Sequence, residues 1–265
     1  MRLLITNIGI LAGLDTEHKL RLCGSEMQKF TTLQDAWLLI EDSRFKEWGK
    51  MSEMPSEGIP ADSVIDAEGG AVMPSWCDPH THIVYAGSRE GEFVDKICGL
   101  SYAEIAKRGG GILNSADLLH TLSEDDLYRS AMLRVDEIIR KGTGCVEIKS
   151  GYGLNTADEL KMLRVIKRIK ETSPLKVKST FLGAHAVGRG YSQPDYVDLV
   201  VNEMIPEVGK EQLADYVDVF CDEGFFTPEE TERILEAASK WGMLPKIHAD
   251  ELASSGGVAV GVKHG

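Results

Sequence analysis

The sequence has little of what marks secreted, membrane-spanning or nucleic-acid-binding proteins. Its five cysteines are widely spaced and include no C-x-x-C pair, which argues against a disulfide framework or a structural zinc knuckle. No apolar run approaches the roughly 18 residues of a membrane span. The formal net charge of -13 leaves no basic surface for nucleic acid or an anionic membrane. We therefore expect a cytoplasmic protein that binds neither.

The composition is that of an ordinary soluble globular protein. The 265 residues are 43% hydrophobic and 27% charged, enough for one large domain or a large domain plus a small one. An acidic protein can still bind a small anionic substrate, but it needs a local positive group such as a metal ion or a single arginine.

Residues 1–70 predict a small β-strand domain. "RLLITNIGIL" is strand-like, and "AWLLIEDSRFKEWG" predicts two strands around a turn at Asp42-Ser43. The N-terminal apolar run is broken by Asn7 and lacks a cleavage site, so we interpret it as a strand and not as a signal peptide. The piece is too small to hold a comfortable core of its own.

Residues 71–265 alternate apolar strands with amphipathic helices. Two helix starts are predicted, one from a capping box of Thr156 with Glu159 and one from Thr227, Pro228 and Glu230. The units recur about every 30 to 40 residues, the repeat of strand plus crossover helix. We predict an α/β fold of the (β/α)8 TIM-barrel type with about five units present, and strands at 72–77, 145–149, 177–182, 217–221 and 244–247.

The first predicted unit contains a long insertion between His82 and the helix that begins near Ser123. It includes Arg89, Tyr102 and the "RGGGI" stretch, which matches no phosphate-binding loop because no Lys-Ser/Thr follows it. Insertions of this length often form active-site lids.

His80 and His82 are separated by one residue at the end of the first predicted strand of this region. Residues i and i+2 of a strand face the same side, so both imidazoles are expected to project together. Such a pair suits a metal ion, although two hydrogen-bonded surface histidines explain the motif alone equally well.

Polar residues also follow the other predicted strands. Because the C-terminal ends of barrel strands form the active-site face, we expect these side chains to meet. His248 is the best third metal ligand beside the two histidines, and three protein ligands leave room for an activated water. The residues that follow the second to fifth strands are Tyr152, His185, Asp222, Glu223, His248, Asp250 and Glu251.

Several blocks resemble one family. "VMPSWCDPHTHIVYAGSREGEF", "YAEIAKRGGGI", "EIKSGYGLNTADELKMLRVI", "TFLGAHA", "VDVFCDEGFF" and "IHADEL" are similar, in order, to the imidazolonepropionases of the amidohydrolase superfamily. The resemblance covers essentially everything from residue 60 onward. It implies hydrolysis of the cyclic amide of 4-imidazolone-5-propanoate to N-formimidoyl-L-glutamate in histidine degradation, with one zinc or iron ion and a possible homodimer.

The resemblance also implies a role for individual residues. His80, His82 and His248 match metal ligands, Arg89, Tyr102, Tyr152 and His185 match substrate-contact positions, and Glu251 matches the acidic residue beside the metal-bound water. Arg89 offers a forked donor for the propionate carboxylate, and His185 could polarise the carbonyl or orient the ring. Taken alone, Arg89 reads as a solvated loop charge, Tyr152 as a packing aromatic and Glu251 as a helix-start carboxylate. Lys149 is expected to be structural, and Asp222 and Glu223 to shape the barrel mouth.

The sequence contains only part of the family's strand pattern. Five strands are predicted where the barrel has eight, so a histidine expected soon after residue 265 and the aspartate of the eighth strand are missing from the implied site. We therefore expect a fragment or a truncated protein. Two alternatives stay open: another cyclic amidohydrolase or deaminase on the same barrel, and an inactive truncated metal-binding fragment.

Overall fold

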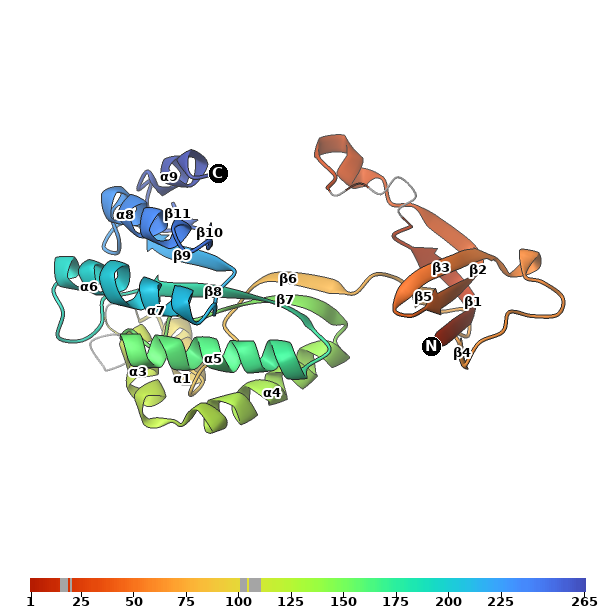
Figure 1. The fold of residues 1–265 in the computed structure, drawn as a ribbon, viewed down its shortest axis with the longest axis horizontal. Coiled ribbons are helices and arrows are strands. Elements are labelled where there is room, and N and C mark those ends of the chain that lie inside the picture. The colour runs from red at the N-terminus through yellow and green to blue at the C-terminus, as the bar shows by residue number, and fades with distance from the viewer. Residues whose placement is uncertain (15–18, 20, 101–103, 105–110) are drawn as a thin grey trace. The chain divides into compact units, whose positions relative to one another are not determined.

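The structure is a computed structural model that describes residues 1–14, 19, 21–100, 104 and 111–265. The chain divides into two compact units, Met1–Ser75 and Trp76–Gly265 (Figure 1). Tyr102 and residues 108–110 of the predicted lid lie outside the described residues. In the part of the chain that is described, no helix is both long and apolar enough to cross a membrane.

The first unit is a five-stranded sheet. Its strands are β1 (Arg2–Ala12), β2 (Thr32–Glu41), β3 (Arg44–Lys50), β4 (Ser63–Asp66) and β5 (Ala71–Val72), and the order is β3-β2-β1-β4 with β5 also pairing with β1. Short 3-10 helices lie at Gly24–Gln28 and Met51–Glu53. The predicted turn is confirmed, because Asp42 and Ser43 both have positive φ, of 48° and 62°, as a two-residue hairpin of the I′ kind requires.

Alternation along β1 and β2 gives this unit two small apolar clusters. One contains Ile8, Leu11, Ala36 and Leu38, and the other contains Leu4, Trp37 and Leu39. Because successive strand residues face opposite sides, Leu38 and Leu39 belong to different clusters.

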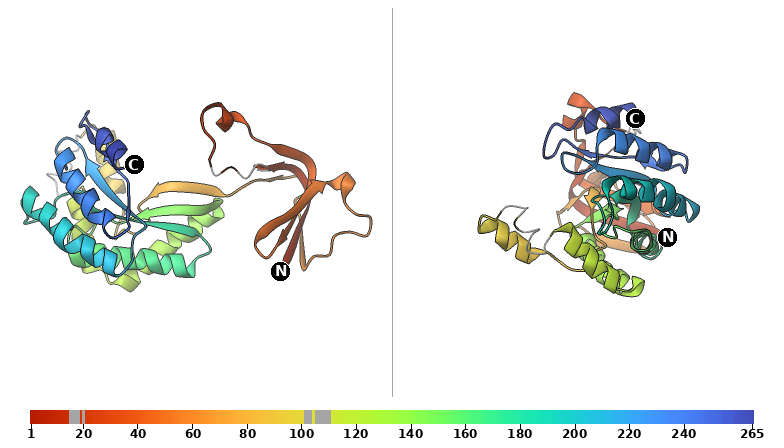
Figure 2. Two further views of the ribbon diagram at one scale, coloured as in Figure 1. Left: turned by 45° about the horizontal axis from the view of Figure 1, so that its top comes forward. Right: turned by 90° about the vertical axis from the view of Figure 1, so that its left-hand side faces the viewer.

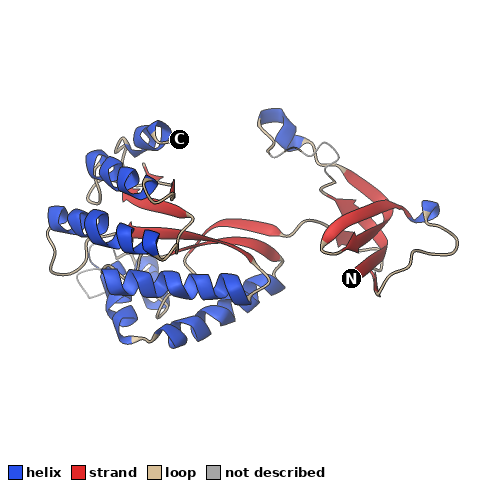
Figure 3. Cartoon of the chain, in the orientation of Figure 1, coloured by secondary structure: helices blue, strands red, loops and turns tan. Residues whose placement is uncertain are grey.

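The second unit is a parallel sheet covered by helices (Figures 2 and 3). Its strands run in the order β10-β9-β8-β7-β6, with β11 also pairing with β9. The parallel α/β architecture predicted from the alternating pattern is therefore confirmed. The strands are β6 (Trp76–Thr81), β7 (Thr143–Lys149), β8 (Lys176–Ala184), β9 (Tyr216–Cys221), β10 (Leu244–Pro245) and β11 (His248–Ala249).

Three of the predicted strands differ from the structure by at most two residues at either end, and the other two differ more. The strand expected at 72–77 is instead β6, while Val72 pairs in the first unit, and Pro74 lies between them without an N–H to donate. The strand expected at 244–247 is two short pairings with β9 that keep one register, since Pro245 pairs with Val217 and His248 with Phe220. Pro245 cannot donate to the ladder, which accounts for the interruption beside it.

Three of the helices each bury an apolar stripe against the sheet. In α5 (Thr156–Thr172), Leu160, Leu163 and Ile166 are buried at helical spacing, as an amphipathic helix requires, and this helix packs on β8. The helices are α1 (Glu90–Ile97), α3 (Ile112–Thr121), α4 (Glu124–Arg140), α5 (Thr156–Thr172), α6 (Gln193–Leu199), α7 (Ile205–Lys210), α8 (Pro228–Ser239) and α9 (Gly257–Lys263), with a π-helical turn at Val200–Met204.

Both predicted helices begin within one residue of the predicted start, but only one of the two predicted capping boxes is formed. Thr227 caps α8 by accepting the N–H of Glu230, whose carboxylate returns to the N–H of Thr227. At α5 the N-cap is Asn155, which accepts the N–H of Asp158, so the capping box of Thr156 with Glu159 is not formed. Glu159 instead points inward and binds the loop that precedes the helix.

Candidate active site

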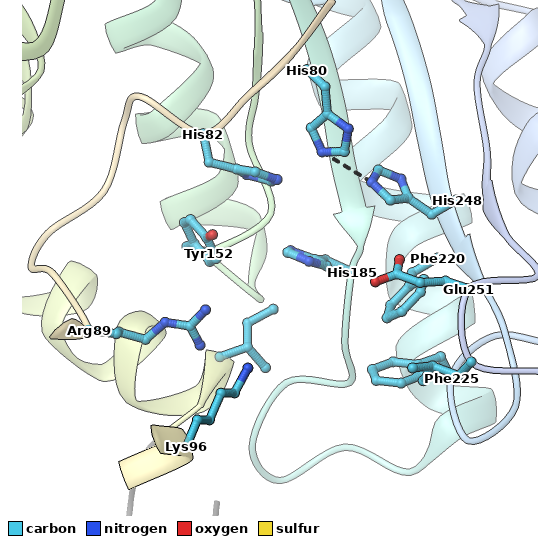
Figure 4. Close-up of a pocket in the computed structure, with 12 residues that line it drawn as sticks. His80, His82, Arg89, Lys96, Tyr152, His185, Phe220, Phe225, His248 and Glu251 are labelled. Carbon is cyan, nitrogen blue, oxygen red and sulfur yellow. Dashed lines mark hydrogen bonds between the residues drawn. The ribbon is translucent and has the colours of Figure 1, made fainter. Parts of the chain in front are cut away.

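A cavity of about 610 Å³ lies in the second unit, where the strands end (Figure 4). Its wall contains every described residue that the resemblance assigned a role, together with residues that the sequence did not indicate, whereas Asp222, Glu223 and Asp250 do not line it. The lining residues are His80, His82, Arg89, Lys96, Ile112, Tyr152, His185, Phe220, Phe225, His248, Glu251 and Leu252.

His80 and His248 meet across this cavity. His80 lies in β6 and His248 begins β11, and their Nε2 atoms are 3.2 Å apart, as the dashed line in Figure 4 marks. The ring planes are nearly perpendicular, at 89°, with centroids 4.7 Å apart. The two imidazoles therefore direct the same kind of nitrogen at one point.

Asp218 of β9 lies behind His248. Its Oδ2 is 3.0 Å from His248 Nδ1, within ion-pair distance, although Nδ1 makes no well-aligned hydrogen bond. Burial alone would raise the pKa of Asp218, and the contacts with His248 and Lys149 outweigh burial and lower it. A buried carboxylate behind an imidazole is the usual partner of a metal-binding histidine.

His82 lies beside this pair and packs against His185. Its ring centroid is 5.8 Å from that of His80, and the ring stacks on His185 at 5.4 Å with planes 13° apart. Tyr152 lies 5.1 Å away on the same side. Burial lowers the pKa of His82 to about 3, so the ring is neutral at pH 7.

The donor set can be tested for a metal ion. Two nitrogens each about 2.0–2.1 Å from one tetrahedral zinc ion are about 3.3 Å apart, which the His80–His248 pair matches. Among the described residues, no three side chains of the His, Cys, Asp and Glu types assemble into a metal-binding group. The pair thus fits an ion, whereas the predicted set of three histidines is not brought together as three ligands.

The loop after β7 presents Tyr152, and β8 ends near His185. His185 Nδ1 lies 3.0 Å from the carbonyl oxygen of Gly151, and because a carbonyl only accepts, Nδ1 is the donor. Burial lowers the pKa of His185 to about 4, and in the neutral ring Nε2 is then an acceptor. Burial also raises the pKa of the Tyr152 hydroxyl, which stays protonated and able to donate.

Two cationic side chains, Arg89 and Lys96, point into the other end of the cavity (Figure 4). Arg89 is the N-cap residue of α1, and its Nη1 is 3.7 Å from Glu92 Oε2. Lys96 lies seven residues later, two helical turns along the same face. That spacing is the signal in the sequence that could have identified Lys96, but a lysine on a charged helix reads as a solvated residue.

Glu251 enters the cavity wall on a loop that Asp222 holds. The Asp222 carboxylate accepts N–H groups from Glu251 at 2.8 Å, Leu252 at 2.8 Å and Ala253 at 3.2 Å, as well as that of Glu223 at 2.8 Å. These bonds, that of Leu252 first, lower the pKa of Asp222. Asp222, which the sequence predicted only to shape the barrel mouth, thus fixes the backbone beside Glu251.

Lys149 is buried outside the cavity wall, in agreement with a structural role. Its Nζ lies 2.5 Å from Glu147 Oε1 and 2.8 Å from Asp218 Oδ2. Glu147 also pairs with Lys246 and accepts from Thr180 Oγ1 at 2.6 Å. This network links Lys149 through Asp218 to His248.

Comparison with known proteins identifies the relatives of the chain. It is 53% identical over 266 residues to the imidazolonepropionase of Christiangramia forsetii and 51% identical to that of Flavobacterium psychrophilum. Both matches cover 100% of this chain and 64% of the relative. The resemblance to imidazolonepropionases is confirmed. This chain spans less than two thirds of the length of these imidazolonepropionases, and no protein-family model matches it.

Solved structures support the same kind of fold. A triazine hydrolase from Arthrobacter aurescens matches with a TM-score of 0.62 at 15% identity, covering 100% of this chain and 58% of that one. A 5-methylcytosine deaminase from Klebsiella pneumoniae matches with a TM-score of 0.60 at 16% identity, covering 87% and 52%. The imidazolonepropionase-like chain therefore has an amidohydrolase-type fold.

Proposed function

We propose that the protein hydrolyses the cyclic amide of 4-imidazolone-5-propanoate to N-formimidoyl-L-glutamate, in the degradation of histidine, on a (β/α)8 barrel. The observation that supports this most directly is the polarity of the cavity. Arg89 and Lys96 lie at one end, and His80, His248 and Glu251 lie at the other. A substrate with a carboxylate tail and a reactive ring amide matches that division, and 53% identity to an imidazolonepropionase agrees with it.

The cations determine which way the substrate binds. The Arg89 guanidinium is a forked donor that pairs with a carboxylate through two hydrogen bonds. Lys96 adds a second positive charge beside it, so the propionate group is attracted to this end despite the negative charge of the whole chain. The ring is thereby directed toward the imidazoles.

Neutral groups then orient the ring. His185 Nε2 accepts a ring N–H, because Nδ1 is already donated to the Gly151 carbonyl. The Tyr152 hydroxyl donates to a substrate oxygen or nitrogen. Tyr102 is proposed as a further contact from the sequence resemblance. Phe220 and Phe225, with ring centroids 4.1 Å apart, form an apolar wall that limits water in the cavity.

We propose that one divalent ion, zinc or iron, binds between His80 and His248, with His82 as the third candidate ligand. When bound, such an ion supplies Lewis acidity that polarises the amide carbonyl and lowers the pKa of water. Glu251 acts as the general base that takes a proton from the attacking water. Water adds to the carbonyl carbon, the ring C–N bond breaks, and the proton that Glu251 has taken passes to the leaving nitrogen. The carbon becomes a carboxylate, and the nitrogen remains in the formimidoyl group.

The decisive experiment uses the full-length protein with 4-imidazolone-5-propanoate. Loss of the imidazolone absorbance and detection of N-formimidoyl-L-glutamate by mass spectrometry are the expected results. Release of ammonia from aminated purines or pyrimidines, with no consumption of the imidazolone, would instead support a deaminase, the alternative that the likeness to 5-methylcytosine deaminase favours. Cytoplasmic localisation and a homodimer remain predictions.

A further inference from the structure

Glu159 is a fully buried carboxylate that the proposed chemistry does not use. It lies in the first turn of α5 with an exposed fraction of 0% and does not line the cavity. Its Oε1 accepts the N–H groups of Gly153 at 2.7 Å and Leu154 at 3.1 Å, and its Oε2 accepts that of Gly151 at 3.0 Å. Burial raises the pKa of this carboxyl, and the backbone donors act in the opposite direction.

The three donors belong to the loop that presents Tyr152. The loop, residues 150–154, follows β7 and ends where α5 begins. A carboxylate that accepts the N–H groups of Gly151 and Gly153 fixes the peptide before Gly151 and the peptide after Tyr152, so the backbone is held on both sides of Tyr152. Because buried N–H groups need acceptors, the loop would have to rearrange if this carboxylate were lost.

The same loop also determines the orientation of His185. The Gly151 N–H donates to Glu159, while the Gly151 carbonyl accepts from His185 Nδ1 at 3.0 Å. One residue thus connects the carboxylate to the imidazole. If Gly151 moves, Nδ1 loses its acceptor and the ring is no longer held with Nε2 as the free acceptor.

The loop packs closely against both α5 and His185. A Cβ atom on Gly153 would lie 2.4 Å from the Glu159 nitrogen, and one on Gly151 would lie 2.9 Å from His185 Nδ1. Gly151 also has a φ of 109°, which residues with side chains rarely adopt. The loop therefore lies directly between α5 and His185.

We propose that Glu159 is a positioning residue of the active site, which holds loop 150–154 so that Tyr152 and His185 keep their orientations toward the cavity. The inference rests on the proposed function only in treating Tyr152 and His185 as substrate contacts. Its structural part concerns the loop and the imidazole, and it can be measured without substrate.

The first test compares Glu159→Gln with Glu171→Gln in the full-length protein. Glu171 is the matched control because it lies in the same helix and is exposed. Glutamine has one acceptor oxygen and a donating NH₂ group, so it cannot accept all three N–H groups. Nitrogen-15 NMR of labelled histidine is expected to show His185 protonated on Nδ1 in the wild type and in Glu171→Gln. A mixture of tautomers is expected in Glu159→Gln, and an unchanged His185 signal in that variant would overturn the proposal.

The second test separates positioning from a general loss of stability. In Glu159→Gln we expect kcat/KM for the imidazolone to fall roughly 10- to 100-fold, the loss that follows from an unsatisfied buried group. Glu159→Asp keeps the charge and is expected to recover part of the loss. If kcat/KM and stability fall equally in Glu159→Asp and Glu159→Gln, Glu159 has only a structural role.

A third measurement needs no variant, and so stands if Glu159→Gln does not fold. Hydrogen exchange of the Gly151, Gly153 and Leu154 amides in the wild-type protein is expected to be slow, because all three are bonded to a buried carboxylate. Exchange at the rate of solvated loop amides would overturn the proposal. If the exchange and the histidine tautomer are as expected but the imidazolone is not consumed, the proposed function fails and the loop architecture stands.

Discussion

His80 Nε2 and His248 Nε2 lie 3.2 Å apart on strands separated by 168 positions in the sequence. Two unprotonated imidazole nitrogens repel at that distance, so one ring must donate or both must bind a cation. Burial is the first reason that the pKa of His80 is lowered, and the nearby charge of His248 adds to it. The lowered pKa disfavours protonation of His80, and this favours a divalent ion between the two rings.

This arrangement predicts how zinc binds to the 265-residue chain. We expect weak, substoichiometric zinc, because two converging imidazoles and a third that stacks on His185 make an incomplete set. His80→Gln and His248→Gln should each weaken binding at least about tenfold, as loss of a metal-ligand contact does. His120→Gln is the control, since His120 pairs with Asp158 away from the cavity wall. Competition with a chromophoric chelator measures all three, and tight stoichiometric binding would show that the ligand set is wrong.

Arg89→Ala is expected to discriminate between substrates. Loss of a charge-assisted pair should lower kcat/KM roughly 10- to 100-fold for the propionate-bearing imidazolone and much less for a ring-only analogue. Lys96→Ala should act in the same direction with a smaller effect, because a single ammonium cannot form the forked pair. Steady-state kinetics on both substrates give the comparison. Equal losses on the two substrates would contradict a carboxylate-binding role for Arg89.

The hydrogen bonds of the Asp222 carboxylate lead us to expect that the stability of the protein depends on pH. The pKa of Asp222 is lowered in the folded state by backbone N–H donors, so the unfolded chain binds the proton more tightly. The stabilisation is therefore present above the unfolded value of about 3.9 and is lost as pH falls through the folded value. Asp222→Asn should be less stable than wild type at pH 7, and the difference should narrow below about pH 4.

Urea denaturation at several pH values measures that difference. Asp198→Asn is the matched control, because Asp198 is 55% exposed in an ion pair with Arg233 and should change stability little at any pH. A gap between wild type and Asp222→Asn that stays constant down to pH 3 would argue against the backbone bonds as its source.

Lys149→Met tests the buried ion-pair network. The substitution leaves Glu147 paired with Lys246 and Asp218 without its ammonium partner, and removing one member of a buried pair costs about 3–5 kcal/mol. Lys141→Met removes an exposed pair with Glu137 and should change stability little. Denaturant unfolding compares the two. Similar small losses in both variants would mean that Glu147 and Asp218 are protonated or hydrated in the folded protein.

Strand and helix periodicity predicted much of this fold. The hairpin at Asp42-Ser43, the parallel α/β sheet and the capping box at Thr227 all follow from local chemistry, and each is present. The errors occur where local signals compete. Glu159 has the right spacing for a capping box with Thr156, but Asn155 caps the helix and Glu159 satisfies buried backbone groups instead.

The candidate site was predictable as a set of residues at strand ends, but not as a geometry. The sequence could place His80 and His82 on one side of a strand, and His82 nevertheless stacks on His185. Side-chain rotation depends on neighbours that are distant in sequence, such as Tyr152 and Gly151. Lys96 was not predicted for a similar reason. Its role depends on the cavity that it faces, which the sequence of its helix does not show.

Glu159 and Asp222 each hold a loop through backbone N–H groups, which every residue except proline possesses. The side chains at positions 152 and 251 do not make these bonds, so the loops keep their shape when those side chains change. An exchange at position 152 can therefore alter which molecule the pocket prefers while the scaffold stays intact. In an evolving lineage, new substrates become accessible through exchanges at position 152, whereas position 251 must keep the carboxylate that the reaction uses.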